Sequence, residues 1–211
     1  MKERRVSEAV IRRLPRYYRQ LELLAAKDVE RISSSELAQQ MGLNPSQVRQ
    51  DLNCFGGFGQ QGYGYPVQKL HKEIAAILGL TRTYRMVIAG AGNIGQALCN
   101  YEGFANRGFE VIALFDIDEN LIGKSVSGKP IMHVDQLSDF IRENDVDIGI
   151  IAARRRAAQP IADTMVEAGI RGIWNFVPID VTAPVPLENI QLSDSMFVLS
   201  YRLNSGTDED E

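Results

Sequence analysis

Three glycines, Gly90, Gly92 and Gly95, have the spacing of a loop that binds phosphate groups. The first glycine permits a tight turn, the second lets the backbone approach a pyrophosphate, and the third lets the following helix pack closely on the preceding strand. Amide groups at the start of that helix would face the negative charge. The spacing therefore predicts a dinucleotide-binding loop, made of Gly90, Ala91, Gly92, Asn93, Ile94 and Gly95.

An acidic residue stands where recognition of a ribose requires one. Residues 86–89 are apolar, as a buried parallel strand should be, and a second apolar run over 111–115 ends at Asp116. A carboxylate about 20 residues past the last glycine can accept hydrogen bonds from both ribose hydroxyls, and it repels a 2′-phosphate. We therefore expect NAD(H) rather than NADP(H), and include Asp118 among the cofactor contacts. A glycine-rich turn that binds no nucleotide is the alternative.

The rest of the carboxy-terminal part alternates strands and helices, which predicts an α/β fold with a parallel sheet. We expect strands over 129–134, 146–152 and 172–176, and helices over 135–143 and 160–168. Arg154, Arg155 and Arg156 follow one strand at its carboxyl end, where ligands of open α/β sheets bind. They could hold a pyrophosphate or form a solvated turn.

Two short helices separated by a tight turn precede this region. Ser33 and Glu36 have the spacing of a capping box, Gly42 is a helix terminator, and Asn44-Pro45 caps and begins the next helix. Such a pair predicts a helix-turn-helix. The polar face of the second helix suits a DNA major groove, because arginine pairs with guanine, and glutamine or asparagine with adenine. The candidate DNA contacts of this helix are Ser46, Gln47, Arg49, Gln50 and Asn53.

Alternating glycines and aromatics over 55–65 predict a β-hairpin wing after this helix, with Gln60 and Gln61 near its tip and Tyr63 as a further DNA contact. Before the motif we expect a short helix from Ser7 through Arg13, then a second helix with Pro15 in its first turn. Arginines in this segment are candidate phosphate contacts, which supply affinity without sequence information: Arg4, Arg5, Arg12, Arg13 and Arg16. A helical interaction domain with solvated arginines is the alternative.

Charge divides the chain in two. Residues 1–84 contain 13 lysines and arginines against 8 aspartates and glutamates, a net +5, whereas residues 85–211 contain 10 against 19, a net −9. The acidic overall charge therefore does not argue against DNA binding. No run is apolar enough to span a membrane, no signal peptide opens the chain, and the two cysteines indicate neither disulfides nor a metal cluster, so we expect a cytoplasmic location and no metal.

The stretch from Gln47 to Tyr65, QVRQDLNCFGGFGQQGYGY, closely resembles the signature of the Rex family of redox-sensing transcriptional repressors. The resemblance continues through GAGNIG, YEGF at 101–104, FDID at 115–118 and GIRGIWNFVP at 169–178, and so covers nearly the whole chain. It implies a homodimer with an amino-terminal winged helix, a carboxy-terminal Rossmann domain and a carboxy-terminal helix exchanged between subunits. It also implies binding to palindromic operators, release by NADH, and competition by NAD⁺.

By the same resemblance, Arg49 contacts DNA and Tyr101 lies beside the nicotinamide. Arg19 and Asp194 form a redox-sensitive contact, with Tyr101 as a hydrogen-bonding partner. The domains expected are a winged helix over 1–80, a Rossmann domain over 84–187, an exchanged helix over 188–204, and an acidic tail over 205–211.

Three positions depart from the family pattern. Gln50 and Gln61 stand where members often have a lysine and a basic residue, and Ser195 stands where an aromatic or aliphatic residue often follows the aspartate. Fewer cations weaken phosphate attraction, so operator affinity or base preference is expected to differ. Met196 or Phe197 could replace the contact that Ser195 lacks.

Two other functions remain as alternatives, a small NAD(H)-dependent oxidoreductase and a module that binds CoA or another nucleotide. A dehydrogenase needs a second site that orients its substrate, usually with a general acid or base. Too little chain remains for a substrate domain, and no pairing of catalytic residues is evident, so we expect a regulator and not an enzyme. Asp116 argues against the phosphorylated ribose of CoA.

Overall fold

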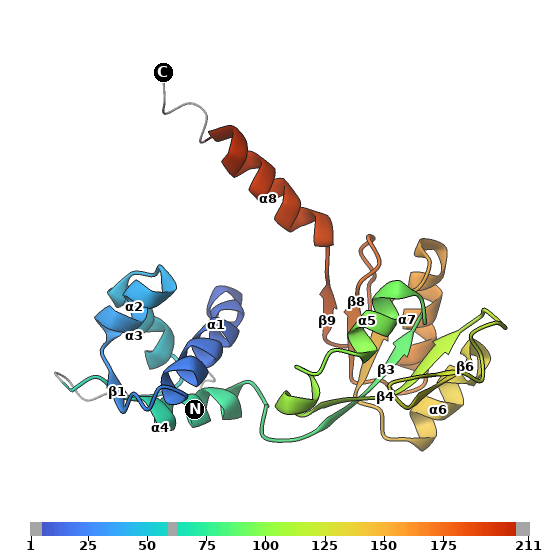
Figure 1. The fold of residues 1–211 in the computed structure, drawn as a ribbon, viewed down its shortest axis with the longest axis horizontal. Helices are drawn as coiled ribbons and strands as arrows, with labels where there is room; N and C mark the ends of the chain where they lie inside the picture. Colours follow the sequence, from blue (N-terminus) through green and yellow to red (C-terminus); the bar gives the residue numbers. More distant parts are fainter. Residues whose placement is uncertain (1–5, 59–62, 206–211) are drawn as a thin grey trace. The chain divides into compact units, whose positions relative to one another are not determined.

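The computed structural model describes residues 6–58 and 63–205, which form two compact units, Met1–Arg82 and Thr83–Glu211. The first unit has one apolar core and the second has two, and the helices and strands of both units are drawn in Figure 1. Arg4, Arg5, Gln60 and Gln61 lie outside the described residues, as does all of the expected acidic tail except Ser205.

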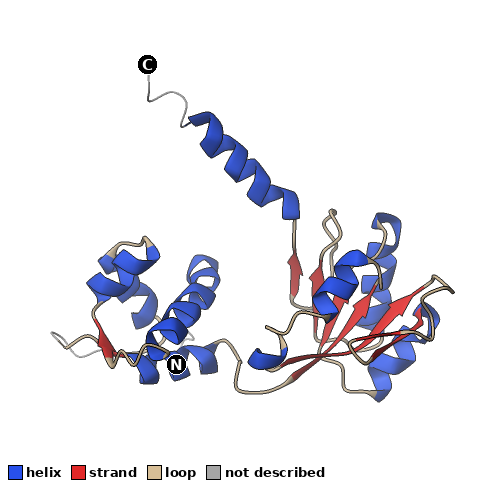
Figure 2. Ribbon diagram, in the orientation of Figure 1, coloured by secondary structure: helices blue, strands red, loops and turns tan. Residues whose placement is uncertain are grey.

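The first unit is helical, with one small antiparallel sheet (Figure 2). Its elements are α1 Glu8–Ala25, β1 Arg31–Ile32, α2 Ser34–Met41, α3 Pro45–Asn53, β2 Tyr65–Pro66 and α4 Val67–Ile77. Its core combines side chains from α1, α2, α3 and α4, so all four helices support one another.

One continuous helix, α1, replaces the two that were expected, of which the first ended at Arg13 and the second had Pro15 in its first turn, so that prediction was wrong. Pro15 lies inside α1, and Ser7, its N-cap, makes no side-chain capping bond. A proline in a helix interior costs roughly 3 kcal/mol. The buried face of α1 continues past the proline on both sides, through Val10, Leu14, Tyr17, Leu21 and Leu24. Burying each such side chain contributes about 1.5–3 kcal/mol, which outweighs the cost of the proline.

The tip of the expected hairpin wing, residues 59–62, lies outside the described residues, and the described ends of the wing do not pair as expected. Residues 55–58 form no strand, and β2, the returning end of the wing, pairs antiparallel with β1 instead. Phe55 and Phe58 pack against the core of the first unit, and Tyr65 of β2 is 7% exposed. Burial of these aromatic side chains, rather than pairing between the two ends of the wing, therefore fixes the described part of this segment.

The second unit is an α/β layer structure with a seven-stranded sheet in the order β5-β6-β4-β3-β7-β8-β9. Its strands are β3 Tyr84–Ala89, β4 Phe109–Asp116, β5 Ser125–Val126, β6 Lys129–His133, β7 Ile148–Ile151, β8 Gly172–Asn175 and β9 Leu187–Asn189. All neighbouring pairs are parallel except the edge pair β5–β6. Its α-helices are α5 Asn93–Cys99, α6 Leu137–Glu143, α7 Ala158–Glu167 and α8 Leu192–Ser205, and short 3-10 turns cover Ala105–Arg107, Val134–Gln136 and Arg155–Ala157.

Successive side chains of β3 point to opposite faces of this sheet. Val87 and Ala89 belong to a core shared with α6 and α7, whereas Met86 and Ile88 belong to a core that α5 covers (Figure 1). Because the strands are parallel and apolar on both faces, both faces must be covered by helices. The order of the strands reverses between β3 and β7, and the carboxyl ends of strands at such a point form the usual ligand crevice.

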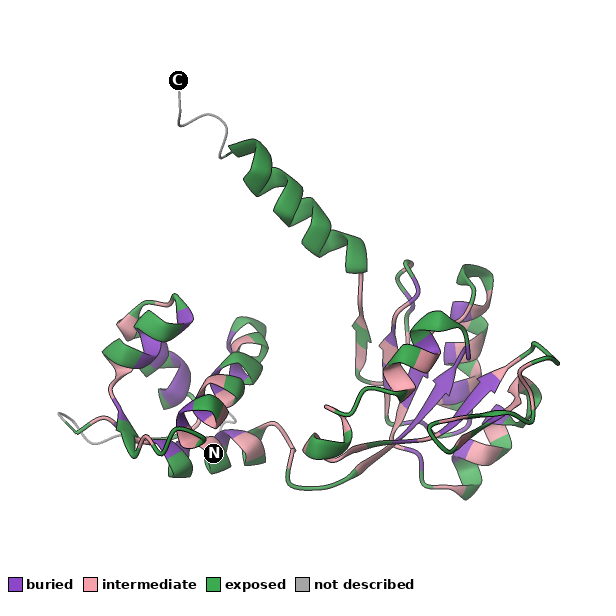
Figure 3. Cartoon of the chain, in the orientation of Figure 1, coloured by how far each residue is buried: buried purple, intermediate pink, exposed green. Residues whose placement is uncertain are grey.

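The last helix, α8, differs from the others because none of its described residues is buried (Figure 3). No helix in the described ranges combines the length and apolar character that crossing a membrane requires.

Candidate nucleotide-binding and nucleic-acid-binding sites

The glycine loop lies at the carboxyl end of β3, at the point where the sheet order reverses. Gly90 has φ +108°, and a Cβ atom there would collide with the backbone carbonyl of Ala152, just past the end of β7. A Cβ at Gly95 would collide with the carbonyl of Gly90. At Gly92, the N-cap of α5, a Cβ would meet none of the described atoms within 4 Å. The first and third glycines therefore permit close packing, and the second leaves open space for a ligand.

Asp116, at the end of β4, faces this loop. One carboxylate oxygen accepts a hydrogen bond from the Ala91 amide at 2.6 Å, and the other accepts from the amides of Ile117 at 2.7 Å and Asp118 at 3.0 Å. Asp116, which we expect to bind the ribose, thus also joins the glycine loop to β4. A ribose diol would approach a carboxylate that backbone donors already hold in position.

Asp118 is exposed and is held in a local turn. Its carboxylate accepts hydrogen bonds from the backbone amide and the side-chain amide of Asn120, both at 2.9 Å. These bonds lower the pKa of Asp118, and the positive charges of Lys124 and Arg154 lower it further. Arg154, Arg155 and Arg156 are all exposed where the chain leaves β7, so an anion could reach them, although within the described residues no hydrogen bond or ion pair joins them to the glycine loop.

Tyr101 lies just past the carboxyl end of α5, whereas Gly90 and Gly92 of the glycine loop precede its first residue. A seven-residue helix is about 10 Å long, so the two features are separated by roughly that length. Tyr101 is 57% exposed, and its ring packs edge-on against Phe104, with ring centroids 4.9 Å apart. It crosses the backbone of Gly103, where any Cβ atom would touch the ring.

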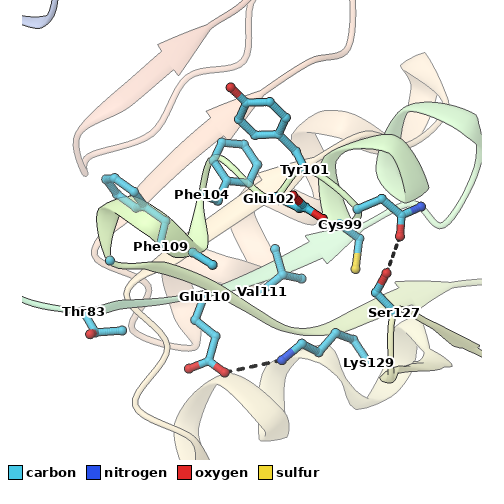
Figure 4. A pocket seen from close by; sticks show the side chains of 13 residues that line it. Thr83, Cys99, Tyr101, Glu102, Phe104, Phe109, Glu110, Val111, Ser127 and Lys129 are labelled. Carbon is cyan, nitrogen blue, oxygen red and sulfur yellow. Dashed lines mark hydrogen bonds and ion pairs between the residues drawn. The ribbon is translucent and has the colours of Figure 1, made fainter. Parts of the chain in front are cut away.

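Tyr101 and Phe104 are part of the rim of a pocket of about 410 Å³ (Figure 4). Thr83 and Phe109 place this pocket at the amino-terminal ends of β3 and β4, away from the glycine loop. Two pairs line its floor: Lys129 and Glu110 at 3.4 Å, and Ser127 and Asn100, whose side-chain oxygens are 2.5 Å apart.

The helix-turn-helix consists of α2 and α3. The predicted capping box is confirmed, since the Ser33 amide donates to Glu36 at 2.8 Å and the Glu36 amide donates to the Ser33 hydroxyl at 3.1 Å. These bonds lower the pKa of the Glu36 carboxyl. The predicted terminator Gly42 adopts the left-handed conformation, with φ +64°, and the Asn44 side chain caps α3 by accepting from the Ser46 amide.

Helix α3 presents the polar side chains that the sequence indicated. Val48 and Leu52 are buried, whereas Ser46, Arg49, Gln50 and Asn53 are exposed and Gln47 is half-buried. Arg49 donates to the hydroxyl of Ser34 at 3.1 Å, which holds the guanidinium beside the start of α2. In the wing, Tyr63 is 71% exposed, and Arg31 of β1 donates to its backbone carbonyl at 2.8 Å.

Arg13, expected to contact phosphate, is instead engaged within the first unit. Its guanidinium donates two hydrogen bonds to Asp51 of α3, and 21% of its side chain is exposed. The Asp51 carboxylate also accepts from the hydroxyl of Tyr17. Arg19 of α1 and Asp194 of α8, the expected switch pair, are both exposed.

Comparison with known proteins identifies both units. A family model described as "Putative DNA-binding protein N-terminus" matches residues 5–53, and one described as "CoA binding domain" matches residues 81–179. The chain is 56% identical to the redox-sensing transcriptional repressor Rex of Caldicellulosiruptor bescii, over 96% of this chain and 94% of that protein. It is 51% identical to Rex of Clostridium perfringens, over 96% and 97%. The chain belongs to the Rex family.

Solved structures of a Rex-family repressor agree with this assignment. The structure of RSP in complex with β-NAD⁺ and operator DNA has a TM-score of 0.92 and 53% identity, and covers 96% of this chain and 94% of RSP. RSP in complex with β-NADH has a TM-score of 0.90 and 50% identity, and covers 96% of each chain. The expected fold, a winged-helix DNA-binding domain followed by a Rossmann domain with a parallel sheet, is therefore confirmed.

Sequence reasoning missed three residues that hold this Rex-family chain's site residues in place. Ser34 positions Arg49, Arg31 holds the wing, and Asp51 joins α3 to α1. Asp51 carried one available signal, because an acidic residue one turn from Val48 and beside Leu52 falls on the buried face of α3. A buried charge requires a partner.

Proposed function

We propose that this chain is a transcriptional repressor that binds palindromic operator DNA as a homodimer and is released when NADH binds. The observation that carries the proposal is that one chain combines an exposed polar recognition helix with a glycine loop facing Asp116. The relatives support it, since RSP has been solved with operator DNA and β-NAD⁺ and with β-NADH. The protein would therefore respond to the NADH/NAD⁺ ratio, in the cytoplasm.

Exposed side chains of α3 would read the operator. Arg49 is suited to guanine and Gln50 or Asn53 to adenine, with Ser46 and Gln47 near the amino end of the helix. Tyr63, Gln60 and Gln61 of the wing would add contacts to the DNA. We withdraw Arg13 from the proposed set of phosphate contacts, because its guanidinium is bonded to Asp51.

The cofactor would lie along the carboxyl edge of the sheet. The glycine loop, with Ala91, Asn93 and Ile94, would hold the pyrophosphate, and Asp116 would accept the ribose hydroxyls, with Asp118 nearby. Tyr101 would sense the nicotinamide ring. The relatives named above are transcriptional repressors, which supports a regulator rather than an enzyme.

Helix α8 would complete the dimer by docking on a second copy of the chain. Its apolar side chains are exposed, with Phe197 at 69% and Tyr201 at 73%, and such a surface on a monomer marks an interaction site. Met196 and Phe197 adjoin Ser195, whose hydroxyl donates to the carbonyl of Leu192. In the proposed switch Asp194 pairs with Arg19 or with Tyr101, depending on the cofactor that is bound.

Two dimer arrangements would then couple the cofactor to DNA. One spaces the recognition helices about one DNA turn apart, and the other closes around NADH and spoils that spacing. By linkage, NADH and DNA weaken each other's binding by the same factor. The corresponding coupling free energy is about 1–3 kcal/mol.

The test is fluorescence anisotropy on a labelled palindromic duplex that the protein itself selects from a random pool. Saturating NADH should weaken binding by roughly 5- to 150-fold, whereas NADPH should have little effect. Equal affinity with and without NADH would contradict the proposal. Release by CoA in place of NADH would favour a CoA-binding module, and steady oxidation of NADH with a small substrate would favour an oxidoreductase.

A further inference from the structure

The recognition helix has a charged contact on its buried side. Asp51 directly follows Gln50 in α3, but its side chain points into the first unit and the residue is 2% exposed. One carboxylate oxygen accepts from Nε of Arg13 at 2.7 Å and from the Tyr17 hydroxyl at 2.9 Å. The other accepts from Nη2 of Arg13 at 2.8 Å. Both partners belong to α1, so this cluster joins α1 to α3 across 34 to 38 residues of sequence.

Arg13, Tyr17 and Asp51 are all joined by hydrogen bonds within the cluster. Tyr17 is fully buried, and burial together with the hydrogen bond to Asp51 raises the pKa of its hydroxyl well above the ordinary range, so it remains a donor. The hydrogen bond to Asp51 also raises the pKa of Arg13. A buried carboxylate needs such partners, because an unpaired charge in the interior is strongly destabilising.

The geometry of these bonds restricts rotation of the helix about its own axis. Val48 and Leu52 pack α3 against the core, but apolar contacts are non-directional and allow small rotations. A bidentate arginine–carboxylate pair has a fixed planar geometry. A second arginine of α1, Arg16, donates to the backbone carbonyl of Met41 at the carboxyl end of α2 at 2.8 Å. Helix α1 therefore holds both helices of the helix-turn-helix.

We infer that Arg13, Tyr17 and Asp51 are positioning residues that set the rotation of α3 and thereby determine how selectively Arg49, Gln50 and Asn53 read the operator. The inference rests on the proposed DNA-binding function and adds residues that touch no base. A rotated helix keeps its positive charge near the phosphates but misaligns its side chains with the base edges. Loss of the cluster should thus reduce discrimination between sequences rather than general attraction to DNA.

The experiment compares each substitution with a matched neighbour. Tyr17→Phe removes one hydrogen bond and keeps the ring, and Tyr18→Phe makes the same chemical change next to it. Arg13→Gln removes the charge from the cluster, and Arg12→Gln removes the same charge from a side chain that is 64% exposed and pairs with Glu8. For each variant we measure affinity for the operator and for a scrambled duplex, the salt dependence of both, NADH affinity and the thermal midpoint.

Tyr17→Phe and Arg13→Gln should each lower the operator-to-scrambled affinity ratio about tenfold, the discrimination expected from one good base contact. Scrambled-DNA affinity, salt slope and NADH affinity should stay near wild type for Tyr17→Phe, and Tyr18→Phe should preserve the ratio. An unchanged ratio in Tyr17→Phe and Arg13→Gln overturns the inference. It is also overturned if Arg13→Gln lowers both affinities equally and reduces the salt slope by about one, as loss of a phosphate contact would.

Hydrogen exchange of the α3 amides, measured without DNA, separates this inference from the proposed function. Exchange should be faster in α3 of Tyr17→Phe than in wild type, with the second unit unchanged, even if the wild-type protein bound no operator. Unchanged exchange in α3 contradicts the positioning role. If Arg13→Gln does not fold, Tyr17→Phe alone tests the positioning role, because this variant keeps the ion pair between Arg13 and Asp51 and the packing of the aromatic ring.

Discussion

The two units present their binding surfaces in different ways. In the second unit the glycine loop is shaped by backbone, where Gly90 and Gly95 permit contacts that any Cβ atom would block. In the first unit the proposed DNA-reading surface consists of side chains on α3, and other side chains, chiefly Asp51 and Ser34, hold that surface in place. A backbone site thus depends on the absence of atoms at a few positions, whereas a side-chain site depends on partners distant in sequence.

The largest effect is expected from a matched pair in the glycine loop. Gly90→Ala introduces a Cβ against the Ala152 carbonyl at φ +108°, so it should destabilise the second unit by roughly 2–4 kcal/mol and abolish NADH binding. Gly92→Ala meets open space, so stability should be kept while the approach of the pyrophosphate is blocked. Thermal denaturation measures the stability of the two variants, and titration with NADH measures their cofactor affinity. Equal thermal midpoints for the two variants would contradict the division of roles.

Arg49→Ala tests the side-chain site. A bidentate base contact contributes about 1–3 kcal/mol, and a homodimer contains two, so operator affinity should fall roughly 100-fold. NADH affinity should be unchanged in the absence of DNA. Ser34→Ala is the companion variant, because it removes only the hydroxyl that accepts from Arg49 and should have a smaller effect in the same direction. Wild-type operator affinity in Arg49→Ala would refute its role as a DNA contact.

Asp116→Asn tests the side chain that supports the glycine loop and is also the proposed ribose contact. Asparagine keeps one acceptor oxygen, but its NH2 group replaces the other oxygen, which accepts from backbone amides in the wild-type protein, and the negative charge is lost. NADH affinity should fall about tenfold, the cost of a hydrogen bond to a charged group, and the preference for NADH over NADPH should narrow. Parallel titrations with the two cofactors measure this. An unchanged ratio of their affinities would mean that Asp116 does not select the ribose.

The smallest effect concerns the capping box of α2. Its hydrogen bonds lower the pKa of Glu36 in the folded protein, so the ionised form is favoured by folding. That stabilisation is present above the unfolded pKa and is lost as pH falls through the folded pKa. Glu36→Gln keeps a capping residue without a titrating group, so it should flatten the acid side of the stability profile of the first unit. Chemical denaturation across the acid range is the measurement, and an identical profile for both proteins would contradict the prediction.

Features with a short sequence range were predicted correctly. The capping box, the Gly42 terminator, the Asn44 cap and the tight geometry of the glycine loop are confirmed, because each depends on residues only a few positions apart. Pro15 misled the prediction, because the local cost of a proline is visible in the sequence and the buried face that offsets it is not. The pairing of β2 with β1, more than 30 residues earlier, was likewise absent from the predicted wing, because no local pattern marks a partner so far away in the sequence.

The sequence by itself determined the order of the elements, the glycine loop with its acidic partner, and the polar face of the recognition helix, since spacing and residue type specify these locally. Only the tertiary structure decided what individual charges do. Arg13 and Arg12 are adjacent and chemically identical, yet one is bonded to a buried carboxylate and the other forms an exposed pair within α1. The reason is that a charge takes its role from the groups that folding brings beside it, and those groups lie far away in the sequence.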